Sequence, residues 1–105
     1  MEYYITDSPH YKSDRPHILY STKTKRDMLI HARNLAIKHY MVDCWKEGVW
    51  KSQGAAIAVS DKTVYLYTFK DGMDVYYRIN SDGSLSKNVS EKGIAKANKI
   101  MDHWR

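Results

Sequence analysis

The sequence predicts a single α+β domain in which an antiparallel sheet packs against two basic amphipathic helices. Apolar residues recur at helical spacing over about 25–41 and again over about 89–104. Between these segments, residues 55–86 alternate apolar and polar side chains and are divided by turn residues, as in a β-meander. A chain of 105 residues can build one modest core, so we expect one domain spanning 1–105.

Two short β-prone runs come before the first helix. Glu2–Thr6 ends at an Asp-Ser-Pro sequence, and His17–Ser21 follows a polar stretch closed by Arg15-Pro16. The two runs can pair as a hairpin with a long loop. We expect roughly four or five of the β-prone segments to form the sheet.

The first helix is predicted over about 25–41. Thr24 stands three residues before Asp27, an acidic variant of the capping box that begins many helices. Residues 43–54 then read as a long connection that either wraps the core or presents an aromatic contact. Within this segment, Trp45 is interpreted as a core residue. Trp50, which is flanked by Gly48 and Lys51, is interpreted with equal weight as a core residue or as an exposed contact.

The meander consists of strands separated by recognisable turns. The clearest turn is Lys70-Asp71-Gly72, because Asp-Gly pairs tolerate the positive φ angles of a tight hairpin. Ser60–Lys62 and Asn80–Gly83 mark the other two turns. The predicted strands are Ala55–Val59, Thr63–Phe69, Met73–Ile79 and a short one around Leu85.

The second helix, over about 89–104, is introduced by Asn88 and Glu91 at the spacing of a capping box. Lys92, Lys96 and Lys99 follow at intervals that place them on one helix face. Such a face suits contact with phosphates, although lysine-rich solvated faces are also common on surface helices.

We expect both helices to cover the same face of the sheet and to leave the other face open. In one orientation the open face carries Tyr65, Tyr67, Tyr76 and Arg78, an aromatic and basic platform suited to stacking or docking. In the reverse orientation these tyrosines are buried, and the sequence leaves both orientations open.

Charge points to an anionic partner. The net charge is +5, and the excess lies in two segments: residues 22–40 hold five basic and one acidic residue, and residues 87–105 hold five and two. Without a signal-like N-terminus or a long apolar run, we expect a cytoplasmic protein that does not enter membranes.

Motifs of enzyme and metal sites are lacking in the sequence. It contains neither G-x-G-x-x-G nor G-x-x-x-x-G-K-[ST], its five histidines lack ligand spacing, and its acidic residues cluster at turns. The lone Cys44 is interpreted as a small core residue. We therefore expect no enzyme activity, no metal and no cofactor.

Two classes of function remain. The first is a small non-enzymatic binder of nucleic acid or a nucleotide, with lysines on phosphates and tyrosines on bases. The second is a small inhibitor or adaptor that docks on another protein through the same aromatic surface, as an accessory protein of a phage or mobile element would. The oligomeric state is not indicated by the sequence.

Overall fold

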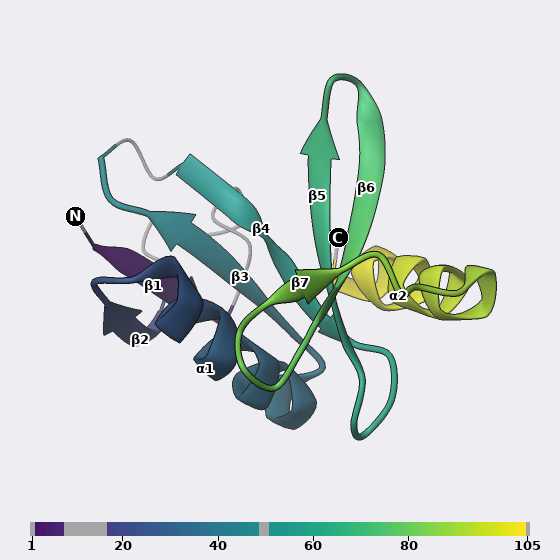
Figure 1. The fold of residues 1–105 in the computed structure, drawn as a ribbon, viewed down its shortest axis with the longest axis horizontal. Coiled ribbons are helices and arrows are strands. Elements are labelled where there is room, and N and C mark those ends of the chain that lie inside the picture. Colours follow the sequence, from purple (N-terminus) through teal and green to yellow (C-terminus); the bar gives the residue numbers. More distant parts are fainter. Residues whose placement is uncertain (1, 8–16, 49–50, 105) are drawn as a thin grey trace.

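The computed structural model describes residues 2–7, 17–48 and 51–104, which form one α+β unit (Figure 1). In chain order the elements are β1 (Tyr3–Thr6), β2 (Ile18–Thr22), α1 (Lys25–His39), β3 (Met41–Lys46), β4 (Lys51–Ala58), β5 (Val64–Lys70), β6 (Met73–Ile79), β7 (Leu85–Ser86) and α2 (Glu91–Trp104). The α+β class, the N-terminal hairpin and the meander are confirmed.

The described residues form one seven-stranded sheet in the order β2-β1-β3-β4-β5-β6-β7, with every neighbouring pair antiparallel. The expected four or five strands were too few because β3 and the first half of β4 were read as a connection. Strand β3 is buried on both faces at Met41, Val42, Cys44 and Trp45. It therefore lacks the polar alternation by which a half-exposed strand is recognised.

Helix α1 ends at His39, two residues earlier than expected, because Tyr40 adopts a φ of 71° and turns the chain into β3. Its start was predicted correctly: the Thr24 hydroxyl accepts the Asp27 amide at 3.2 Å. The Asp27 carboxylate in turn accepts the hydroxyls of Tyr20 at 2.9 Å and Thr22 at 2.6 Å, which fastens β2 to the helix.

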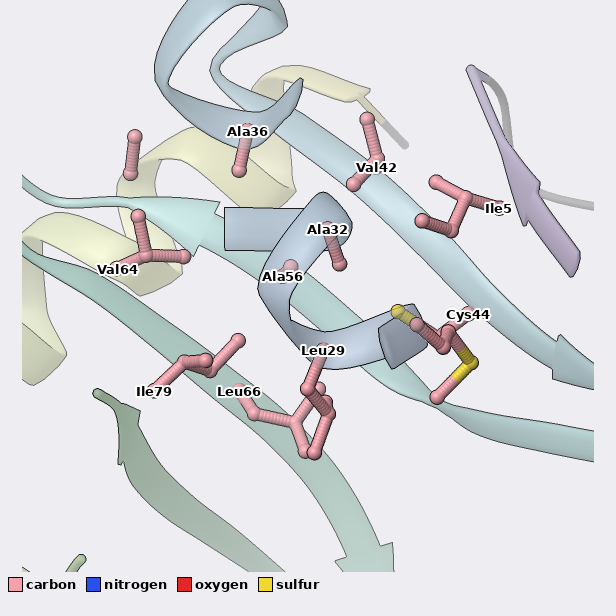
Figure 2. Close-up of a cluster of buried hydrophobic side chains, with 12 residues drawn as sticks. Ile5, Leu29, Ala32, Ala36, Val42, Cys44, Ala56, Val64, Leu66 and Ile79 are labelled. Carbon is pink, nitrogen blue, oxygen red and sulfur yellow. The ribbon is translucent and has the colours of Figure 1, made fainter. Parts of the chain in front are cut away.

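The two helices cover opposite faces of the sheet, so the expectation that both lie on one face was wrong. Helix α1 packs Leu29, Ala32 and Ala36 on Val64, Leu66 and other side chains of one face, while α2 lies behind the strands (Figure 2). Helix α2 packs Ala97 and Met101 on the other face. The members of this second cluster from the sheet are Met41, Ala55, Ile57, Val59, Tyr65 and Tyr76.

The physical reason lies in the central strands, which are apolar on both faces. In β4, Ala56 and Ala58 belong to the α1-side core, while Ala55 and Ile57 belong to the α2-side core. A sheet with two apolar faces needs a cover on each, and one helix supplies each cover.

Helix α2 begins two residues later than predicted. Ser90, rather than Asn88, precedes the first helical residue, and its hydroxyl accepts the Gly93 amide at 3.0 Å. The Ser90 amide donates to the Tyr65 hydroxyl at 3.1 Å, which ties the start of α2 to β5.

Cys44 is a core residue, as predicted, and burial raises the pKa of its thiol to about 12. Neither α1 nor α2 combines the length and the apolar character that a membrane-spanning helix requires.

Candidate functional site

The sheet divides between β4 and β5. The two strands pair only from Ala55–Ala58 to Val64–Tyr67. Beyond that point residues 51–54 stay with β3, whereas residues 68–70 stay with β6, and the β5–β6 hairpin diverges from β4 (Figure 1). We call the resulting hollow the fork cleft; its volume is about 810 Å³. Ligand sites for small molecules commonly fall in this size range.

Gly54 stands at the point of division. Its φ of +128° favours glycine, and the register with β3 shifts next to it, between Cys44 and Trp45. A Cβ atom on Gly54 would lie 2.6 Å from the carbonyl oxygen of Tyr67. The bare backbone thus allows β4 to bend away while β5 stays close.

Lysines gather at the mouth of the fork cleft on the α1 side of the sheet. Lys25 begins α1, and Lys46 and Lys70 end β3 and β5; all three line the cleft, as does Lys51 at the start of β4. The Lys70 ammonium lies 5.7 Å from the centroid of the Tyr77 ring, which is part of the α1-side core. Lys87 lies closer to the same ring, at 4.2 Å.

These lysines lack acidic partners in the part of the chain that the structure describes. The ion pairs found there join His17 to Asp7 and His31 to Asp27, and neither involves a lysine. The positive charge of this mouth is therefore uncompensated, and it favours an anion.

Aromatic side chains and one carboxyl line the opposite mouth, on the α2 side. Tyr67 packs against the α2-side core, and Phe69, two residues on, projects to the same side of β5. The Tyr67 hydroxyl donates to Asp74 at 2.7 Å, which orients its ring. Trp45 is held similarly, because its indole N–H donates to the Thr6 hydroxyl at 2.8 Å.

Asp43 shares this mouth with the rings. Its neighbours Val42 and Cys44 point into the α1-side core, so its carboxyl projects to the α2 side of β3. Burial raises the pKa of Asp43 from 3.8 to about 6. Groups with strongly shifted pKa values cluster at functional sites, which makes Asp43 a candidate site residue.

The predicted tyrosine platform is not formed. Tyr65 and Tyr76 are only 4% and 8% exposed, because α2 covers them. The Tyr76 hydroxyl donates to Asn98 of that helix. Arg78 is opposite Tyr65 in the register and is partly buried. Of the four predicted residues, only Tyr67 lines the cleft.

The predicted lysine stripe of α2 is exposed and lies outside the fork cleft. Lys96 and Lys99 border a separate, shallower hollow of about 660 Å³ with Tyr40, Ile100 and His103. Lys92 is exposed one turn before Lys96. Trp50 lies outside the described residues.

Sequence reasoning missed the cleft residues Lys25, Lys46, Lys70 and Asp43. The three lysines each end or begin a strand or helix, where a solvated lysine is ordinary. Asp43 carried a usable signal, because an acid between Val42 and Cys44 in a buried strand is unusual.

A second cluster of polar side chains lies at the start of α1. His31 stacks on Tyr20 with ring centroids 3.8 Å apart and donates through Nδ1 to the Asp27 carbonyl oxygen, 3.0 Å away. These contacts complete the cap of α1. Nowhere in the described ranges do three His, Cys, Asp or Glu side chains come together as a metal site.

Comparisons give no family to set beside this geometry. No family model, curated protein or solved structure matches the chain.

Proposed function

We propose that the protein is a non-enzymatic binder of a nucleotide or of single-stranded nucleic acid, and that the ligand occupies the fork cleft. The supporting observation is the opposite character of the two mouths. Lys25, Lys46 and Lys70 lie on the α1 side, and Tyr67 and Phe69 lie on the α2 side. A nucleotide likewise has two parts of different character: an anionic phosphate, which suits the lysines, and a planar base, which suits the aromatic rings.

Phosphate binding accounts for the lysines. Three lysines from three different elements line the cleft, and among the described residues no carboxylate forms an ion pair with any of them. Lysine binds phosphate as a point charge and does not need the fixed geometry of an arginine fork. Affinity should therefore fall as salt rises.

Base stacking accounts for the aromatic rings. Phe69 is 66% exposed, which is unusual for a large apolar side chain, and it sits beside the half-buried Tyr67. A base stacked on such rings contributes about 1–3 kcal/mol and needs no particular sequence.

Calorimetric titration with adenosine monophosphate and with a short single-stranded oligonucleotide tests the proposal. We expect the double variant Lys25→Ala/Lys70→Ala to bind both about fivefold to tenfold more weakly. The matched control is Lys38→Ala/Lys62→Ala, which removes the same charge from exposed positions outside the cleft. Equal losses in both variants would rule out the cleft as the binding site.

A second candidate function is supported by the tip of the β5–β6 hairpin. Phe69 and Met73 are 66% and 65% exposed there, and the hairpin projects from the body of the sheet (Figure 1). Exposed apolar groups on a projecting hairpin suit docking on another protein, as in a small inhibitor or adaptor. Met73 does not line the fork cleft, so Met73→Ser separates the two functions. It should abolish capture of a protein partner and leave nucleotide affinity unchanged.

A further inference from the structure

Asp43 is the one acidic residue among the described residues that line the fork cleft. It has no hydrogen bond or ion pair within the described part of the chain, whereas the nearby Trp45 and Tyr67 both have hydrogen-bond partners. Desolvating a carboxylate is costly unless N–H or O–H groups donate to it. Asp43 is only partly buried, so the fold holds a solvent-accessible acceptor beside the aromatic rings that a ligand in the cleft can satisfy.

The position of the carboxyl fits the edge of a stacked base. Asp43 and Trp45 project from the same side of β3, and Tyr67 faces Ala55, which is paired with Asp43. Asp43 and Tyr67 thus lie on the same face of the sheet, on either side of Ala55. A base that lies against Tyr67 and extends over Ala55 has one edge facing Asp43.

The chemistry of a carboxylate discriminates among bases. It has two acceptor oxygens and no donor. Guanine presents two adjacent donors, N1–H and N2–H, on its Watson–Crick edge. Adenine and cytosine place a ring acceptor beside the amino group, and uracil places carbonyl oxygens on both sides of its N–H.

We propose that Asp43 is the specificity-determining residue of the fork cleft and that it selects guanine by accepting both donors of its Watson–Crick edge. This inference rests on the proposed function. Sites built to hydrogen-bond a ligand reject analogues lacking the matching group, because the buried group of the site is then left unpaired.

The test is calorimetric titration of the full chain with the 5′-monophosphates of guanosine, inosine, adenosine and cytidine. All four carry the same phosphate, and inosine differs from guanosine only in lacking the 2-amino group. We expect the wild-type protein to bind the guanosine nucleotide about tenfold or more tightly than the other three.

Asp43→Asn keeps the size of the side chain and replaces one acceptor oxygen by a donor. We expect this variant to lose the guanosine preference and to bind the adenosine nucleotide at least as tightly as wild type does, because an amide has both a donor and an acceptor to match the edge of adenine. Asp61→Asn is the matched control, because Asp61 is exposed in the turn between β4 and β5. It should keep the preference.

The outcomes distinguish a failure of the role of Asp43 from a failure of the proposed function. If wild type binds all four nucleotides equally, or if the guanosine preference survives in Asp43→Asn, the role of Asp43 is overturned while the proposed function stands. If wild type binds neither these nucleotides nor the single-stranded oligonucleotide, the proposed function fails and the role of Asp43 fails with it.

Discussion

Gly54 and Tyr67 meet where the sheet divides, and a Cβ atom on Gly54 would lie only 2.6 Å from the Tyr67 carbonyl oxygen. Leu66 and Thr68 would also be within 3.1 Å of that atom. Because the nearest obstacle is backbone, a side chain can be accommodated only if β4 and β5 move apart. The close approach of β4 and β5 at the base of the fork cleft therefore requires glycine at position 54.

Gly54→Ala should destabilise the protein by about 2 kcal/mol or more, because it adds a backbone clash to the strain of a positive φ. Gly72→Ala is the control: its φ is also positive, at +77°, but nothing lies within 4 Å of a Cβ there. We expect the control to lose about 1 kcal/mol. Urea denaturation measures both, and equal losses would mean that the contact with Tyr67 is easily relieved.

Tyr65 and Tyr76 should behave as core residues. Alanine at either position should reduce the free energy of unfolding by about 3 kcal/mol, since each ring is buried under α2. Tyr65→Phe should reduce the free energy of unfolding by about 1 kcal/mol, because it removes the hydrogen bond from the Ser90 amide.

Tyr67→Ala should weaken nucleotide binding instead and leave the protein folded. Circular dichroism melts beside calorimetric titration check this, and an unfolded Tyr67→Ala would place that ring in the core.

The α2 lysines should matter only for a ligand that extends beyond the cleft. Lys92, Lys96 and Lys99 are exposed on the helix and do not line the fork cleft. Their triple alanine variant should bind mononucleotides normally. For an oligonucleotide, each lost lysine should reduce the logarithmic salt slope by about one unit or less. Titrations at two salt concentrations measure this, and an unchanged slope would remove the stripe from the contact surface.

Asp43 should make stability depend on pH with a sign opposite to that of most acids. Its folded-state pKa is raised from 3.8 to about 6, so the folded state binds the proton more tightly than the unfolded state. Stability should fall as pH rises from about 4 to about 6, by a contribution on the order of 2–3 kcal/mol. Above about pH 6 the carboxyl is ionised in both states, and the full destabilisation is present.

Asp43→Asn should remove this penalty and raise the unfolding free energy at neutral pH, while leaving stability below about pH 4 nearly unchanged. Denaturation of both proteins across the pH range tests the sign. A variant less stable than wild type at neutral pH would show that the carboxylate has a favourable partner in the folded protein.

Local patterns were sufficient for the elements whose signals lie within a few residues. The cap of α1 at Thr24 and the tight turn at Asp71-Gly72, where both residues have positive φ, were predicted from residue type alone. Strand β3 was missed because an apolar run buried on both faces has no periodicity to distinguish it from a helix end or a connection.

The cleft could be predicted only in part. Tyr67 was proposed as a contact residue and lines the cleft, whereas its predicted companions Tyr65 and Tyr76 lie under α2. The lysines that replace them come from α1, β3 and β5, positions far apart in sequence. Nothing in their spacing indicates that they meet.

The sequence by itself determined the α+β class, the order of the meander, the start of α1 and the alternation by which the side chains of β5 project to two faces. Only the tertiary structure decided that α1 and α2 cover opposite faces and that the sheet divides at Gly54. The reason is physical: alternation shows that a strand has two distinct faces, but what covers each face depends on burial against elements distant in the chain. Tyr65 and Tyr67 occupy the same face of β5, yet one is sealed by α2 and the other opens into the cleft.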